Sequence, residues 1–278
     1  MTLNEVYQES LLKLQNPDVD EINIRIILCE VNRIKTMTEY YLHKNDNIRD
    51  LQLFYSIFAR FLDGEPLQYI LGKTEFFGLE FCVNRNVLIP RQETEEVVAF
   101  ALQKIKQEFG TKSIRLLDVC CGSGCMGISV AKNIACSSII FSDLSPAAIQ
   151  VTKNNLTKHN LDAKTYIGNA LKPIIYNGEK VDVVVSNPPY IINRSDVDES
   201  VVKFEPEMAL FCTDSLEVYS KIFEGLEKIK DGKLLAVFEI GYDLKELLIT
   251  LIHEKLPNAH YEFAKDINGK ERILSLTL

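Results

Sequence analysis

The sequence predicts a mixed α/β protein in which a mainly parallel seven-stranded sheet, ending in an antiparallel hairpin, follows a small all-helical domain. Apolar residues recur at helical spacing in the first quarter of the chain, where no strand pattern is present. Predicted strands and helices then alternate between residues 114 and 240, which is typical of a parallel sheet covered on both faces. The last two predicted strands are joined by a turn so short that they must be antiparallel.

Residues 1–73 are expected to form the helical domain, as four or five short helices. Its apolar positions include Ile24, Ile27 and Leu28, which fall on one helical face. Turn-forming and helix-ending residues mark the predicted breaks, at Asn16-Pro17, near Thr36, at residues 45–47 and at residues 64–66.

A linking β-hairpin is predicted over residues 74–90, and residues 91–278 are expected to form the α/β domain. The hairpin region is rich in aromatic and β-branched residues, with a predicted turn at Asn84-Arg85-Asn86. In the α/β domain, strands are predicted at residues 114–119, 138–143, 164–168, 181–186, 233–240, 259–265 and 272–278, and helices at 124–133, 145–159 and 215–230.

Charge and composition favour a protein partner over a nucleic acid. The net charge is −8, which opposes binding to a long phosphate backbone. Seven cysteines without a Cys-x-x-Cys pair predict free thiols in a reducing compartment and no metal site. The N-terminus lacks a secretory signal pattern, and no segment has the roughly 18 uninterrupted apolar residues of a membrane span. We therefore expect a cytoplasmic monomer that binds neither DNA nor membranes directly.

A glycine-rich turn follows the first strand of the α/β domain. Gly122, Gly124 and Gly127 match G-x-G-x-x-G between a predicted strand and helix, the context in which this pattern binds nucleotide-like ligands. Asp143 ends the next strand, where a carboxylate can accept hydrogen bonds from ribose hydroxyls. Loop and acid should face one crevice. These two features alone fit S-adenosylmethionine and NAD equally well.

A proline-bounded loop, Asn187-Pro188-Pro189-Tyr190, follows the strand at residues 181–186 and reaches the same sheet edge. Prolines remove N–H donors and hold the preceding residue extended, so the loop is stiff and rich in acceptors. Such a loop suits a planar –NH₂ group, which offers two donors. We expect the Asn187 side-chain oxygen and the Pro188 carbonyl to accept these donors, and the Tyr190 ring to pack on the flat amide. The pattern predicts methylation of a conjugated amino or amide nitrogen.

With both motifs, the chain resembles the release-factor glutamine methyltransferases, the PrmC/HemK family of class I S-adenosylmethionine-dependent methyltransferases with a Rossmann-like fold. The resemblance covers nearly the whole chain. Its most specific part is the bridge between the helical and catalytic domains, at residues 65–78 and 87–95. Further matches lie at residues 205–210, 239–242 and 265–272.

The resemblance implies that S-adenosylmethionine is the cofactor and that the partners are class I peptide release factors, proteins of translation termination that are modified at the glutamine of their Gly-Gly-Gln motif. Residues 1–73 would recognise the substrate, and residues 187–190 would hold the glutamine. The cofactor residues implied are Cys120, Cys121, Gly122, Ser123, Gly124, Asp143, Asn169 and Asn187, and the catalytic residues are Asn187, Pro188 and Tyr190.

Three positions depart from the family pattern. Gln92 stands where the family usually has proline, which should loosen the start of a helix without touching the chemistry. Cys120 and Cys121 occupy loop positions where small residues are usual, so their backbone should contact the ligand. Asn169 and Ala170 stand where an acidic and an aromatic residue are common. Asn169 can still bond the adenine edge, whereas Ala170 offers no ring for stacking.

Three other functions remain open from the sequence. An adenine-N6 DNA methyltransferase also acts on a conjugated –NH₂, but it must extrude a base and hold phosphates. Residues 1–72 carry 7 Lys or Arg against 11 Asp or Glu, which does not favour that task. An NAD-dependent oxidoreductase would need a hydride-handling acid or base that the cleft motifs do not supply. A non-catalytic sensor would use the cofactor pocket alone.

Overall fold

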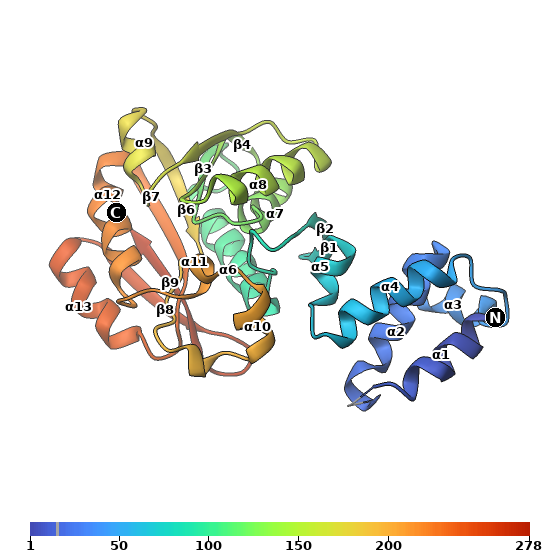
Figure 1. Cartoon of the computed structure of the whole chain (residues 1–278). Coiled ribbons are helices and arrows are strands. Elements are labelled where there is room, and N and C mark those ends of the chain that lie inside the picture. The colour runs from blue at the N-terminus through green and yellow to red at the C-terminus, as the bar shows by residue number, and fades with distance from the viewer. Residues whose placement is uncertain (15–16) are drawn as a thin grey trace. The chain divides into compact units, whose positions relative to one another are not determined.

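The computed structural model describes residues 1–14 and 17–278, without the side chains of residues 17–20 and 196. The chain divides into two compact units, Met1–Leu71 and Gly72–Leu278. Figure 1 shows helices in the first unit and a helix-covered sheet in the second. Across the described residues, no helix combines the length and apolarity that crossing a membrane requires.

The first unit contains five described helices packed around one apolar cluster. They are α1 (Leu3–Leu11), α2 (Pro17–Asn32), α3 (Met37–His43), α4 (Leu51–Leu62) and α5 (Leu67–Leu71). Ile24, Ile27 and Leu28 are buried with Phe54 and Phe58, as their helical spacing predicts.

Side-chain caps begin several of these helices. At the start of α1, the Thr2 hydroxyl accepts from the Glu5 N–H while the Glu5 carboxylate accepts from the Thr2 N–H. At the start of α3, the Thr36 hydroxyl accepts from the Glu39 N–H. The predicted break near Thr36 is therefore confirmed. The break predicted at Asn16-Pro17 falls partly on residues 15–16, which lie outside the described residues.

The hairpin of the second unit is tighter than the predicted one. Strands β1 (Lys73–Phe76) and β2 (Leu79–Cys82) pair antiparallel, so the turn lies at Phe77-Gly78. The prediction of the hairpin turn at residues 84–86 was wrong. Both Phe77 and Gly78 have positive φ, at 51° and 70°, as a two-residue hairpin turn demands. A separate turn does form at residues 84–87, where the Val87 N–H donates to the Asn84 carbonyl.

The sheet confirms the predicted fold class. Its strands are β3 (Ile114–Val119), β4 (Cys136–Asp143), β5 (Lys164–Ile167), β6 (Val181–Ser186), β7 (Lys230–Glu239), β8 (His260–Lys265) and β9 (Glu271–Thr277). They run in the order β5-β4-β3-β6-β7-β9-β8. The first five strands are parallel, whereas β9 is antiparallel to both β7 and β8. The chain leaves β3 first toward β4 and later returns on its other side to β6, which places a ligand-binding crevice at the carboxyl ends of these strands.

Helices cover both faces of this sheet (Figure 1). One apolar cluster contains residues of α6 (Gln92–Phe109), α7 (Cys125–Asn133) and α8 (Pro146–Lys158), and the other contains residues of α9 (Lys172–Tyr176), α12 (Glu217–Ile229) and α13 (Lys245–Lys255). Strand β6 contributes side chains to both apolar clusters: Val183 and Val185 belong to the first, and Val181 and Val184 belong to the second. The sequence predictions placed a helix start at Gln92 without giving bounds for α6, and they did not assign α9 or α13.

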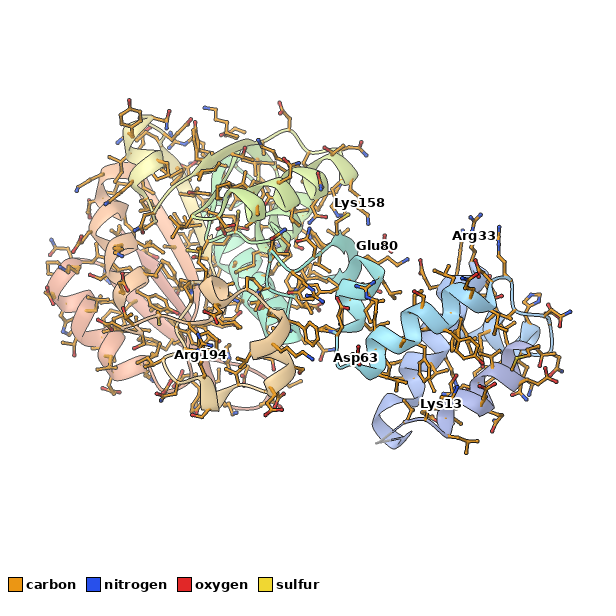
Figure 2. All side chains as sticks on the ribbon, in the orientation of Figure 1. Lys13, Arg33, Asp63, Glu80, Lys158 and Arg194 are labelled. Atoms are coloured by element: carbon orange, nitrogen blue, oxygen red, sulfur yellow. The ribbon has the colours of Figure 1, made fainter. Side chains whose placement is uncertain are left out.

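Two short helices, α10 (Glu199–Phe204) and α11 (Glu207–Leu210), and a 3-10 turn at Arg194–Asp196 follow the loop after β6. The Arg194 guanidinium, labelled in Figure 2, forms an ion pair with Glu207 at 2.8 Å.

Helix α6 begins at Gln92, and its N-cap residue Arg91 makes no side-chain capping bond. The helix therefore starts at Gln92 although this position lacks the proline that is usual in the family pattern.

The hairpin is tied to α8 by polar contacts. Asn155 is fully buried, its Nδ2 donating to the carbonyls of Cys82 (3.0 Å) and Ser123 (2.8 Å) and its Oδ1 accepting from the Cys82 N–H at 2.7 Å. At the surface, Lys158 donates to Glu80 over 2.6 Å, both labelled in Figure 2. One amide therefore joins β2, the glycine loop and α8.

Replacing Asn155 with alanine should lower the stability of the second unit by about 3 kcal/mol, because buried backbone groups at Cys82 and Ser123 would lose their partners. Calorimetric melting measures the loss. Asn154→Ala, on the exposed side of the same helix, is the matched control. Equal melting temperatures for the two variants would contradict the assigned role of Asn155.

Candidate active site

A cavity opens at the carboxyl edge of the sheet, where β3, β4, β5 and β6 end. The strand ends and the loops after them contribute residues 118–123 from β3, 142–145 from β4, 168–170 from β5, and Asn187 and Pro189 from β6. Residues 85–88, 90–91, 94, 206, 208 and 209 also line the cavity. Two further segments thus line the cavity beside the strand ends: the segment between the hairpin and α6, and the segment around α11. The two sequence motifs converge here because parallel strands present their carboxyl ends together.

The glycine loop follows the geometry that its sequence requires. Gly122 and Gly124 have φ of 54° and 79°, values that suit glycine, and α7 begins directly after them at Cys125. A Cβ on Gly127 would lie 2.6 Å from Phe141 Cε1, so helix and sheet could not pack with a larger residue there. Cys120 is a non-glycine residue at φ 59°.

Most residues predicted to bind the cofactor surround this cavity. Cys120, Cys121, Gly122 and Ser123 line it, as do Asp143, Asn169 and Asn187. Gly124 is not part of the lining found among the described residues, and a Cβ there would meet Thr152 at 3.0 Å. Gly124 therefore acts on the shape of the loop. That the other residues contact a cofactor remains a prediction.

The Asp143 carboxylate organises the loops around it. Its Oδ2 accepts from the Gly122 N–H at 2.9 Å, and its Oδ1 accepts from the Ser145 N–H at 2.8 Å. Burial raises the pKa of Asp143, while these backbone donors act in the opposite direction. The side chain that should accept ribose hydroxyls therefore also fixes the glycine loop against the start of α8.

Asp118 is a second carboxylate of the cavity, and the sequence predictions did not single it out. It lies on β3, is 1% exposed and accepts from the Gly127 N–H at 2.8 Å. Burial, reinforced by the negative charge of Asp143, raises the pKa of Asp118 to about 8. An acid inside the otherwise apolar run Leu116-Leu117-Asp118-Val119 was the available sequence signal.

Asn187 lines the cavity directly after β6. Its Nδ2 lies 3.5 Å from the Thr94 hydroxyl, a long hydrogen bond. Pro189 lines the cavity as well, whereas Pro188 is buried. Thr94 was not singled out from the sequence, although it lies in the segment 87–95 that carries the resemblance.

Tyr190 points its hydroxyl at a buried ionic group. The hydroxyl lies 3.4 Å from Glu239 Oε1 and 3.4 Å from Arg272 Nη1. Burial raises the pKa of Tyr190, and the Glu239 carboxylate adds to this effect. The predicted packing of its ring on a substrate amide stays a prediction.

Glu205 precedes the cavity-lining residue Pro206 and joins two segments of the cavity wall. Its side chain is 1% exposed, and it accepts from Arg91 Nη2 at 2.6 Å and from the Ile89 N–H at 3.1 Å. These bonds join residues more than 100 positions apart, which no local sequence pattern reveals. Glu205 therefore holds the segment after the hairpin against the segment around α11.

The cysteines at the cavity are free thiols buried to different degrees. Cys121 and Cys125 are buried and Cys120 is half-buried. Burial raises the pKa of each thiol well above its usual value, so each stays protonated. Among the residues that the structure describes, no cluster of three or more His, Cys, Asp or Glu side chains is arranged to hold a metal ion.

Comparisons with known proteins agree with this geometry. The Methyltransferase small domain family matches residues 90–207, and the PrmC N-terminal domain family matches residues 6–72. A release factor glutamine methyltransferase of Staphylococcus aureus is 37% identical over 245 residues, covering 86% of this chain and 86% of the relative. The chain belongs to the release factor glutamine methyltransferase family. It is therefore a methyltransferase.

Other members of the release factor glutamine methyltransferase family match over more of the chain. The Bacillus cereus protein is 34% identical over 94% of both chains, and the Borreliella burgdorferi protein is 33% identical over 99% of this chain and 94% of its own. The match to this family extends through both units.

Solved structures support the fold of the larger unit. A ribosomal protein L11 methylase from Lactobacillus delbrueckii subsp. bulgaricus has a TM-score of 0.50 at 14% identity, covering 70% of this chain and 83% of its own. The catalytic domain of hMettl16, in complex with MAT2A 3′UTR hairpin 6, has a TM-score of 0.53 at 16% identity, covering 72% and 75%. The Rossmann-like methyltransferase fold is thus shared well beyond this family.

Proposed function

We propose that this methyltransferase transfers a methyl group from S-adenosylmethionine to the side-chain amide nitrogen of a glutamine in class I peptide release factors, at their Gly-Gly-Gln motif. The observation that carries the proposal is the position of Asn187, whose amide lines the same cavity as the glycine loop and Asp143. The relatives that match both units are named for a release factor glutamine. Those names do not support the adenine-N6 DNA methyltransferase alternative.

The cavity suits a cationic cofactor. Asp118 and Asp143 both line it, and a positive charge nearby would favour the ionised form of each. A dinucleotide such as NAD would instead bring a negatively charged pyrophosphate into a cavity lined by these two acids. S-adenosylmethionine, when bound, supplies a sulfonium-activated methyl group. We propose that the backbone of residues 120–123 holds it, with Asp143 accepting from its ribose and Asn169 bonding the adenine edge.

The loop at residues 187–190 orients the substrate in this proposal. The Asn187 oxygen and the Pro188 carbonyl each accept one N–H of the glutamine carboxamide, so its nitrogen is fixed in the cavity. As that nitrogen forms a bond to carbon it becomes positively charged, and the two acceptors then bind it more tightly than in the ground state. No strong base is needed before attack, because the nitrogen keeps both protons, hydrogen-bonded to the two acceptors, while the bond to carbon forms. The cationic product nitrogen then releases one proton to water.

Residues 1–73 are proposed to recognise the release factor. The PrmC N-terminal domain family covers most of this region, and its charge suits a protein better than phosphates, with 7 Lys or Arg against 11 Asp or Glu in residues 1–72. Tyr41 and Leu42 expose apolar surface that a protein partner could cover.

Incubation with labelled S-adenosylmethionine tests the function directly, with release factor and DNA offered in separate reactions. We expect label on the release factor alone, and no label when its Gly-Gly-Gln glutamine is replaced by alanine. Label on DNA alone would establish the adenine alternative, and binding of cofactor without any transfer would indicate a sensor.

Asn187→Ala should reduce turnover by roughly 10²–10³-fold, because it removes one of two oriented acceptors. The affinity for cofactor should change by less than about threefold, since the glycine loop and Asp143 remain. Single-turnover rates and calorimetric titration separate the two effects. Turnover near the wild-type rate would remove Asn187 from the mechanism.

Cofactor affinity should rise with pH between 6 and 8. With its pKa raised to about 8, Asp118 is mostly protonated at pH 6 and must lose that proton to face a cation. The dissociation constant should therefore fall by up to about tenfold per pH unit and level off above the pKa. Asp118→Asn, which cannot titrate, should bind more weakly and remove most of the slope. An identical slope in this variant would assign the pH dependence to another group.

A further inference from the structure

We propose that Thr94 and Glu239 are positioning residues that hold both ends of the loop at residues 187–190 and fix the Asn187 amide with its oxygen toward the cavity. The inference rests on the proposed function, because it explains how Asn187 presents an acceptor to a carboxamide. Neither residue is needed to contact the reacting atoms.

Glu239 ends β7 next to the loop, and its two oxygens serve opposite ends of it. Oε2 accepts from the Thr94 hydroxyl at 2.5 Å, and Thr94 in turn lies 3.5 Å from Asn187 Nδ2. Oε1 lies 3.4 Å from the Tyr190 hydroxyl. Thr94 and Glu239 are 3% and 4% exposed, so water does not compete for these bonds. One buried carboxylate therefore reaches the first loop residue through Thr94 and the last one directly.

The chain of hydrogen bonds has a fixed direction. A threonine hydroxyl has a single proton, and here that proton points to the Glu239 carboxylate. The oxygen of Thr94 can then only accept from Asn187, so the NH₂ of the Asn187 amide must face Thr94. The amide oxygen consequently faces away from Thr94. A flipped amide would set two acceptor oxygens against each other, which is unfavourable in a buried site.

This direction requires an ionised Glu239, so that both of its carboxylate oxygens accept. Burial raises the pKa of Glu239, as does the charge of Glu93, whereas the Thr94 hydrogen bond and the positive charge of Arg272 favour the carboxylate. Arg272 Nη1 also lies 3.4 Å from the Tyr190 hydroxyl, and its Nε lies 3.4 Å from Asp266 Oδ2. The terminal hairpin thus supplies the counter-charge for the residue that orients the loop.

The consequence is discrimination at the target side chain. A glutamine carboxamide offers N–H donors, which the Asn187 oxygen accepts, whereas a glutamate carboxylate offers only acceptors and is repelled. If the Asn187 amide were free to turn, its NH₂ could donate to a carboxylate. The preference for glutamine over glutamate therefore depends on Thr94.

Thr94→Val, which keeps the shape and removes the hydroxyl, is compared with Thr94→Ser, which keeps the hydroxyl. We expect the valine variant to lose at least about tenfold in turnover and at least about tenfold in the preference for wild-type release factor over one with glutamate at the target position. Binding is measured with S-adenosylhomocysteine present, so that no transfer occurs. The serine variant should restore most of both properties, and cofactor affinity should change less than about threefold in each.

A folded valine variant with the wild-type preference would overturn the inference, as would a serine variant that fails like valine. If the valine variant melts below the assay temperature, the Thr94→Val, Glu239→Gln double variant removes the unpartnered buried charge and must show the same loss of preference. Wild-type protein that leaves release factor unmethylated would overturn the proposed function and this inference with it. Normal wild-type methylation with unchanged variants overturns the inference alone.

Discussion

The site depends on four carboxyl groups that are largely buried at one edge of the sheet and must find hydrogen-bond donors there. A buried carboxylate is costly unless donors surround it, so each one fixes the segments that supply those donors. Asp118 holds the first turn of α7 and Asp143 holds the glycine loop. Glu205 fastens the segment after the hairpin, and Glu239 reaches both ends of the loop at residues 187–190. The cavity wall is assembled by these four groups.

The same groups give the cavity its chemical character. Asp118 and Asp143 make it favourable for a cation, which separates S-adenosylmethionine from a dinucleotide that uses a similar glycine loop. Glu239 acts differently, because its carboxyl oxygens accept hydrogen bonds from Thr94 and Tyr190 within the protein. Negative charge near the cofactor and a polarised hydrogen bond near the substrate thus come from separate carboxylates on different strands of the sheet.

Much of the site followed from local sequence. The glycine pattern and Asp143 mark the ends of two strands, and the pair of prolines after the strand at residues 181–186 marks a third, so their convergence required only that the strands be parallel. The hairpin was harder to predict from the sequence. Aromatic and β-branched residues extend to Ile89, but strand pairing stops at Cys82, and residues 85–88 line the cavity instead.

The sequence by itself determined the fold class, the two units and the identity of the two loops, because each depends on periodicity or on short motifs whose residues are neighbours in the chain. Only the tertiary structure decided which acids act with which loop. Glu239 and Thr94 are 145 residues apart, and Glu205 and Arg91 are 114 apart. Such pairs form because separate strands and helices end at one edge, and their hydrogen bonds arise from packing that no local pattern encodes.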